Sequence, residues 1–368
     1  MGADTRDMSR APAVLPVERN TGEGLKAVLF RSEERFGSFQ RKLAENGVAI
    51  DLLDFDRDRW IDYDYAGADL AIYYPTFKFS SNHPHALDQV HDNLLFLARE
   101  FPHLALYPDP RVIWYYNDKY RQYLFLKKHR FPTPETLPLV SASSLDEAES
   151  RLGFPMVLKN RHGAGGSAVF LARDRKHLEK YYHVSRLNFF RWGSVRYGAS
   201  LLSRRTFYYH LIRMKKAPYP FLSPPLLAQK FLHIDRDLKT VVGDGRVVEG
   251  HWRLRADRAM WKMNIDGGGI GEWSRIPREA IDLSVRLAGA LQASWLNLDL
   301  IPAPGEFLVT EFSPVWHHYA YREKPSFVYR DDYNIEVPPE IALDLESMLV
   351  ESLLARVRSS VRSAPAGI

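Results

Sequence analysis

The chain has 368 residues, of which 45% are hydrophobic and none is cysteine. This length predicts two or three packed units, and the absence of cysteine excludes disulfides, thiolate catalysis and cysteine-bound zinc, in agreement with a cytoplasmic location. A net charge of +5 suits acidic or phosphorylated ligands without indicating nucleic acid. The charged N-terminus lacks the continuous apolar core of a signal peptide, and no apolar run has the ~20 residues that a transmembrane helix needs.

The first part of the chain predicts a small α/β domain. Residues 1–24 are expected to form a disordered tail, and residues 25–115 alternate strand-like and helix-like segments. The predicted elements are strands at Leu25–Phe30, Val48–Phe55 and Asp69–Tyr74 and helices at Glu34–Asn46 and Ala86–Glu100. Open sheets of this kind bind ligands beyond the carboxyl ends of their strands, so substrate contacts are expected there.

Two lysines are predicted to lie near one site. Asn117-Asp118-Lys119 opens a helix, which Pro132 and Pro134 end, and a short apolar strand then finishes at Lys159. A glycine-rich turn, Gly163–Gly166, follows this strand. Glycines let backbone N–H groups approach an anion closely, and two ammonium groups can clamp phosphate oxygens. Taken alone, the turn is equally consistent with an ordinary hairpin.

Residues 173–225 are rich in aromatic and basic side chains. Three interpretations remain open: an extra pair of packed helices with solvated bases, a cap that binds an acidic or phosphorylated acceptor through arginine, or a surface for nucleic acid or membrane. No known RNA-binding or DNA-binding motif supports the third.

The order of these segments resembles the ATP-grasp superfamily, and within it the carboxylate–amine ligases of the ribosomal-protein glutamate ligase and glutathione synthetase type. The resemblance spans roughly residues 25–314 and implies an α/β (α+β) fold, in which a small open α/β domain precedes two α+β lobes that sandwich ATP. The segments that carry it are Asn117-Asp118-Lys119, Pro132-Thr133-Pro134-Glu135-Thr136, Phe154-Pro155-Met156-Val157-Leu158-Lys159 and the Gly163–Gly166 turn. It implies lobes at 116–228, with the 173–225 region as an insertion, and at 229–358 with a C-terminal helix, before a tail at 359–368.

The resemblance implies a set of nucleotide-binding residues. Leu226–Leu232 is similar to the family's adenine-binding strand, and Asp237-Leu238-Lys239 to its Asp-Ile-Arg, with lysine replacing the arginine fork. The implied contacts are Lys119 and Lys159 on phosphates; Gly163, Gly165, Gly166 and Ser167 in the lid; Gln229, Lys230, Phe231 and Leu232 on adenine; Asp237 on ribose; and Lys239 as a further cofactor-binding residue.

The resemblance also implies catalytic and metal-binding residues. Arg253 is similar to a phosphate-facing arginine and would stabilise an oxyanion, while Lys262 and Asn264 belong to an aromatic-basic-x-Asn element that precedes Gly267-Gly268. Two further segments, Leu296–Ile301 and Phe307–Pro314, are similar to the paired metal strands. On them Asp299 and Glu311 would hold Mg²⁺ between phosphate oxygens, although alone they could be solvated hairpin carboxylates. Ser313 stands where the family has asparagine, which implies a weaker metal ligand.

The C-terminal part carries fewer signals. His317 and His318 point to opposite sides of an extended chain, so at most one could act as a base on the acceptor. Pro338-Pro339 is predicted to start a helix that runs to about Ser359 and packs into the core through Ile341, Leu345, Met348, Leu349 and Leu353.

The implied function is that of an ADP-forming ligase that joins carbon to nitrogen through an acyl phosphate. The implied cofactors are ATP and two Mg²⁺ ions, which Mn²⁺ could replace. Its expected partners are a carboxylate and an amine, on small molecules or peptides, and a second copy of the chain in a homodimer. Two alternatives remain open: a kinase for a phosphorylated alcohol, similar to the inositol-phosphate kinases, and a nucleotide-binding scaffold with weakened chemistry, for which Ser313 argues. The resemblance does not identify the acid or the amine.

Overall fold

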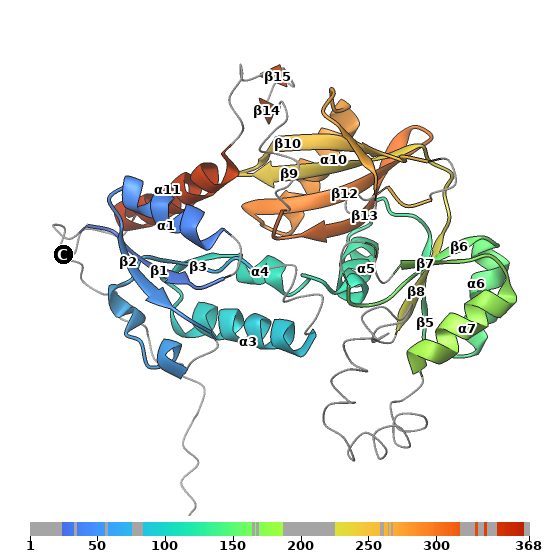
Figure 1. Cartoon of the computed structure of the whole chain (residues 1–368), viewed down its shortest axis with the longest axis horizontal. Helices are drawn as coiled ribbons and strands as arrows, with labels where there is room; N and C mark the ends of the chain where they lie inside the picture. Colours follow the sequence, from blue (N-terminus) through green and yellow to red (C-terminus); the bar gives the residue numbers. More distant parts are fainter. Residues whose placement is uncertain are drawn as a thin grey trace, which may run out of the picture.

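The structure is a computed structural model that describes residues 24–32, 35–55, 58–75, 84–163, 166, 169–186, 225–257, 261–263, 265, 268–316, 328–329, 335–336 and 344–363. It contains three main sheets, arranged from left to right in Figure 1 as an N-terminal sheet, a five-stranded sheet and a smaller four-stranded sheet. The mixed α/β fold class expected from the sequence is confirmed.

The N-terminal sheet is parallel, in the order β2-β1-β3-β4. Helices cover both faces, with α1 and α11 on one side and α3 on the other (Figure 1), so the central strands β1 and β3 are apolar and buried after Lys26, whereas the edge strand β2 contains Asp51 and is partly exposed. The bounds are β1 (Lys26–Phe30), β2 (Ala49–Leu53), β3 (Leu70–Ile72) and β4 (Ala105–Tyr107), with α1 (Phe36–Glu45), α3 (Pro84–Glu100) and two short 3-10 turns, η1 (Asp58–Trp60) and η2 (Tyr65–Gly67). Every predicted element of this part is present, with shifted ends.

The helix α11 (Leu345–Ser363) packs mainly on this first sheet, and it contacts the lobe to which the sequence assigned it through Ser352, which accepts from Trp295 and donates to Asp244. Leu345, Leu349 and Leu353 are fully buried in the N-terminal core. The helix begins after the predicted start at Pro338-Pro339, and residues 338–343, which include Ile341, lie outside the described residues. An amphipathic helix needs an apolar partner, and the pattern alone does not say which.

The smaller four-stranded sheet has the order β5-β8-β6-β7. Its elements are β5 (Thr136–Leu139), α6 (Ser143–Leu152), β6 (Met156–Lys159), β7 (Val169–Ala172), α7 (Arg175–Arg186) and β8 (Leu226–Lys230). The helix α7 starts the predicted insertion, yet Leu178 and Tyr182 on it are buried in the core of this sheet. In the described part of the basic-aromatic region, one face of α7 is therefore core while the basic side chains stay partly or fully exposed, and the remainder, 187–224, lies outside the described residues. The predicted lobe boundary at 228/229 falls inside β8, so the domain division stays a prediction.

The five-stranded sheet is antiparallel, in the order β11-β10-β9-β12-β13. The predicted Asp-Gly turn joins β9 to β10, and both Asp244 and Gly245 have positive φ, as a tight hairpin requires. One face of the sheet packs on α10 through residues such as Leu238 and Leu298. The bounds are β9 (Arg236–Gly243), β10 (Arg246–Leu254), β11 (Ile270–Glu272), α10 (Arg278–Ala290), β12 (Trp295–Ala303) and β13 (Glu306–Ser313).

The opposite face of the five-stranded sheet, which we call the front face, meets the other two parts of the molecule. Val241 and Trp295, at one end of this face, join the N-terminal core. The connecting helices α4 (Pro110–Ile113) and α5 (Lys119–Lys128) lie between the N-terminal sheet and the two others (Figure 1). A two-stranded ribbon, β14 (Val328–Tyr329) and β15 (Ile335–Glu336), completes the described elements. Within these ranges no helix combines the length and the apolar character needed to cross a bilayer.

Candidate active site

The front face carries a grid of polar side chains, because alternate residues of a strand point to the same side of a sheet. Across neighbouring strands, His251 lies opposite Lys239, Lys239 opposite Asp299, and Asp299 opposite Glu311. A parallel row contains Glu249, Val241, Asn297 and Ser313. The spacing of residues along the sequence can predict which side chains are neighbours within one hairpin. That β10, β9, β12 and β13 form one surface follows only from the order of the strands in the sheet.

Asp299 is the most strongly held carboxylate of this face. Its two oxygens accept from Lys239 Nζ at 2.7 Å and from Arg253 Nη2 at 3.1 Å. Burial alone would raise the pKa of Asp299, but the two cations outweigh it and hold the pKa well below its usual range. The carboxylate is therefore charged at all physiological pH values.

Asp237 differs from the expectation of a ribose contact, because both its oxygens are used by Arg253. Arg253 donates to them from Nε at 2.6 Å and from Nη2 at 2.9 Å. Desolvation raises the pKa of Asp237 in spite of this partner. Asp237 thus orients the guanidinium that also contacts Asp299, and its role toward ribose stays a prediction.

The two predicted lysines reach the same strand, β13, from the smaller sheet and from α5. Lys119 Nζ lies 3.4 Å from Glu311 Oε1, and Lys159 Nζ donates to the Thr310 carbonyl at 3.2 Å. Both ammonium groups are buried. Burial lowers the pKa of Lys159 to about 8, because Glu311 offsets only part of the cost of desolvation. The arrangement concentrates positive charge beside one carboxylate, which suits a polyanion.

The Asn117-Asp118-Lys119 segment anchors the start of the glycine turn. Asn117 Oδ1 accepts from the Gly163 N–H at 2.8 Å, and Lys119 Nζ donates to the Gly163 carbonyl. Asp118 accepts from both Arg161 Nε and Nη2, at 2.8 and 2.7 Å, while it also caps α5. The short motif, which is uninformative alone, therefore fixes the position of the turn.

Lys262 reaches the glycine turn from the other side of the site. Its Nζ donates to the Gly166 carbonyl at 2.6 Å. The structure thus brings together Lys119, Lys262 and the described glycines of the turn. Four further predicted or matching residues, Gly165, Ser167, Asn264 and Gly267, lie outside the described residues.

The predicted adenine strand ends beside an aromatic cluster. Gln229 is buried and donates to Thr136 Oγ1 at 2.9 Å, and the Lys230 N–H donates to the Glu135 carbonyl at 2.8 Å. The predicted backbone contact of Lys230 with adenine therefore could not use its N–H without breaking the sheet. Phe231 packs edge-on against His233 and Trp261. The side chains of Phe231 and Leu232 are both half-buried, so part of the apolar surface of each remains accessible.

Two positioning residues on this face were missed by sequence reasoning. Gln122, buried on α5, exchanges hydrogen bonds with the N–H and carbonyl of Phe312, at 3.2 and 2.9 Å, and so fixes β13 between Glu311 and Ser313. Asn297 is buried opposite Ser313, with its amide oxygen facing Lys239 Nζ at 3.0 Å. Ser313 itself accepts a hydrogen bond from the Val315 N–H at 3.1 Å. No pattern in the sequence distinguishes these residues from ordinary core or turn positions.

The donor set fits a magnesium–nucleotide complex better than a metal held by protein alone. Among the described residues, no group of three or more acidic, histidine or cysteine side chains could hold an ion. Mg²⁺ is typically bound by one or two carboxylates together with substrate phosphates. Asp299 and Glu311, directly opposite each other on β12 and β13, supply such a pair.

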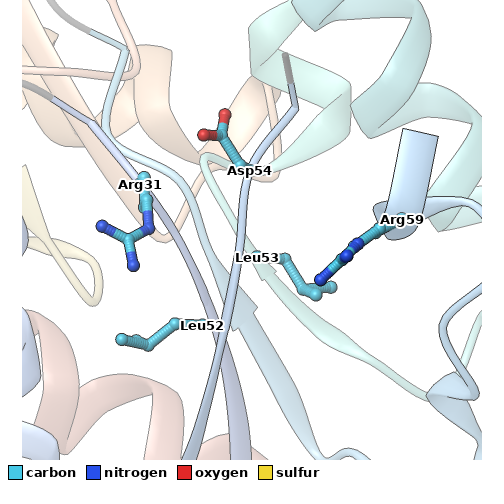
Figure 2. Close-up of a pocket in the computed structure, with 5 residues that line it drawn as sticks. All are labelled: Arg31, Leu52, Leu53, Asp54 and Arg59. Carbon is cyan, nitrogen blue, oxygen red and sulfur yellow. The ribbon is translucent and has the colours of Figure 1, made fainter. Parts of the chain in front are cut away.

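A separate cavity of about 330 Å³ opens at the carboxyl ends of β1 and β2, lined by Arg31, Leu52, Leu53, Asp54 and Arg59. Substrate contacts were expected at this edge of the sheet. Figure 2 shows Arg31 and Arg59 on opposite sides of the β2 backbone, so their guanidinium groups do not converge on one anion. We therefore centre the candidate active site on the front face of the five-stranded sheet.

The lowered pKa of Lys159 predicts a pH effect on the ligand-free protein. Its folded pKa of about 8 lies below the ordinary value of 10.5, so the unfolded chain binds more protons between these values and stability rises with pH. Lys159→Met should be more stable than the wild type at pH 7 by about 3 kcal/mol, and this difference should disappear by about pH 10.5. Chemical denaturation of both proteins between pH 7 and 10.5 measures it, and a difference that is constant with pH would contradict it.

A model described as an ATP-grasp domain matches residues 116–187. Among curated proteins, beta-citrylglutamate synthase B from Mus musculus is 29% identical over 209 residues, which make up 55% of this chain and 44% of that protein. N-acetylaspartylglutamate synthase A from Homo sapiens is 27% identical over 209 residues, with the same coverage of 55% and 44%. The match thus spans less than half the length of either relative.

Among solved structures, D-alanine–D-alanine ligase from Bacillus anthracis is similar with a TM-score of 0.56. The alignment covers 92% of this chain and 100% of that one, at 14% sequence identity. At this identity the likeness concerns the fold, and it extends well beyond the residues that the domain model matches.

Proposed function

We propose that this chain, which has the ATP-grasp fold, is an ATP- and Mg²⁺-dependent ligase that joins a carboxylate to an amine with release of ADP and phosphate. The observation that carries the proposal is the convergence of Lys119 and Lys159 with Glu311 beneath the glycine turn, one strand away from Asp299. Such a site combines cations for a polyphosphate with the carboxylates that a magnesium–nucleotide complex needs.

The proposed reaction has two steps. The substrate carboxylate attacks the γ-phosphorus of ATP to give an acyl phosphate and ADP, and the amine then attacks the acyl carbon and displaces phosphate. Bound Mg²⁺, as two ions or with Mn²⁺ in its place, would neutralise phosphate charge. Lys119, Lys159 and Lys262 would hold the transferred phosphoryl group, and Arg253 would stabilise the oxyanion of the second step.

The substrates are proposed from the names of the relatives. Both names contain glutamate, so L-glutamate is the first amine to test, with di- and tricarboxylic acids as partners on a small molecule or peptide. The kinase alternative relied on the basic region at 173–225, whose described part is the core helix α7, so no observation favours it. A cytoplasmic location and a homodimer stay predictions.

A coupled assay for ADP release tests the proposal. The purified chain is incubated with ATP, MgCl₂ and pools of organic acids, amino acids, polyamines and amino sugars, and products are identified by mass spectrometry. We expect ADP release only when acid and amine are both present, with a product lighter by one water than their sum. A product that retains phosphate would indicate a kinase. If calorimetry shows no binding of ATP, both the ligase and the kinase hypotheses are rejected.

A further inference from the structure

Two acid–base side chains on β10 lie buried on the front face outside the residues assigned so far. Glu249 is 0% exposed and His251 2% exposed. Glu249 Oε1 lies 3.1 Å from His251 Nδ1, whereas Glu249 Oε2 is a buried oxygen with no hydrogen-bond partner in the described part of the chain. A carboxylate removed from water with one oxygen unpaired is destabilising, so its presence needs an explanation.

Trp273 lies against the same imidazole. Its ring stacks on His251 with centroids 5.1 Å apart and planes inclined by 22°. Its buried Nε1 also has no partner among the described residues. A Cβ at Gly271 would lie 2.5 Å from this ring, so glycine is needed there for Trp273 to lie against the sheet. One unpaired acceptor and one unpaired donor therefore flank one imidazole.

The position of these side chains relates them to the proposed reaction. His251 is directly opposite Lys239, which is opposite Asp299, so its Cα is two strand spacings, about 10 Å, from that of Asp299. Glu249 lies one row further from the adenine strand, opposite Val241, which packs into the N-terminal core. The His251 side chain thus shares a row of the front face with Lys239 and Asp299, and Glu249 lies beside the N-terminal core.

The neighbouring cations do not explain the buried carboxylate. Lys239 donates to Asp299, and Arg253 is held by Asp237 and Asp299. Neither of these cations has an ion pair with Glu249 among the described contacts. A ligand that carries its own positive charge and N–H donors would satisfy Glu249 Oε2 and leave the other ion pairs intact.

We propose that Glu249, His251 and Trp273 form the subsite for the acceptor amine, which is recognised as a primary ammonium group. This inference rests on the ligase function proposed above. The ammonium donates to Glu249 and transfers one proton to the Glu249–His251 pair. The nitrogen lone pair then forms the C–N bond and the acyl C–O bond breaks. Phosphate leaves with the bonding electrons and takes up the second proton of the nitrogen, while the Glu249–His251 pair releases the first proton to solvent.

The test compares two amines on the same acyl phosphate. Hydroxylamine is unprotonated near neutral pH and needs neither ammonium recognition nor deprotonation, whereas the amine found in the ADP-release screen needs both. The variants are Glu249→Gln and His251→Asn, which keep similar shapes, and Glu306→Gln, an exposed glutamate on β13, is the control. Amide and hydroxamate are measured separately, together with the KM for ATP and for the acid.

We expect kcat/KM for the amine to fall by about 100-fold or more in Glu249→Gln and His251→Asn, while hydroxamate formation and both KM values change much less. The double variant should lose little more than either single one, because the two side chains act as a unit. Equal losses with both amines, or an unchanged kcat/KM for the amine, would overturn the subsite while leaving the ligase function intact. A wild-type chain that forms neither amide nor hydroxamate with any acid would reject the ligase function and the subsite with it.

Discussion

Glu311→Gln is expected to lower ADP-forming turnover by about 100- to 1000-fold at saturating Mg²⁺, because the variant loses one of two opposed carboxylates that would hold the ion against the phosphates. The folded state should change little. The Glu311 side chain is 32% exposed, and among the described residues it has an ion pair with Lys119 at 3.4 Å, so we expect a stability loss below about 1 kcal/mol.

The control for this experiment is Glu306→Gln, on the same strand but exposed at the β12–β13 turn. Turnover against MgCl₂ concentration and thermal unfolding are measured for both variants and the wild type. If Glu311→Gln keeps turnover within a few fold of Glu306→Gln, the assignment of the metal carboxylates is wrong. A loss of turnover that accompanies unfolding would instead assign a structural role.

Arg253→Met is expected to destabilise the fold by about 3–5 kcal/mol, because it leaves buried carboxylates without their shared cation. Arg253 is 9% exposed and contacts Asp237 and Asp299. Asp299 retains Lys239, but Asp237 loses the guanidinium that uses both its oxygens. The double variant Arg253→Met with Asp237→Asn should therefore recover part of the loss in stability without recovering turnover.

Urea denaturation measures this prediction, with Arg255→Met as the control. Arg255 lies two residues further along the chain and pairs with Asp235, whose side chain is 98% exposed, so this ion pair should contribute little. If the free energy of unfolding of Arg253→Met lies within about 1 kcal/mol of that of Arg255→Met, the buried carboxylates reorganise or take up protons without a large loss of stability. The stability of Arg253→Lys should lie between those of the two methionine variants, because lysine keeps the positive charge but lacks the paired N–H donors of the guanidinium group.

The local elements could be predicted from the sequence because they depend on nearby residues. The strand before Lys159, the Asp244-Gly245 hairpin and the helix after Asp118 each follow from apolar runs, turn residues and a cap. The order of these segments was enough to indicate the fold. The partner of an amphipathic element could not be derived in this way, and α11 packs mainly into the N-terminal core, where the sequence did not place it. The position of α7 agrees with one of the three interpretations of its region, that of packed helices.

The candidate site was predicted in its residue types more than in its contacts. Lys119, Lys159, Asp299 and Glu311 were selected in advance, and the structure brings the two lysines to β13 and sets the two carboxylates opposite each other on β12 and β13. Asp237, selected for ribose, holds Arg253 in a bidentate contact directly across the ladder, and its role toward ribose stays a prediction. Such a competition between partners depends on strand register, which the sequence of one strand does not contain.

The sequence by itself determined which chemical groups the chain can supply. These are lysines before a glycine turn and carboxylates on the β12–β13 hairpin, and cysteine is absent. The tertiary structure decided which of these groups face each other and which are dry. Glu249 and His251, two apart on a strand, have the spacing of an ordinary solvated face. In the folded chain both side chains are buried, and burial leaves one oxygen of the Glu249 carboxylate without a hydrogen bond, which a bound ligand would supply.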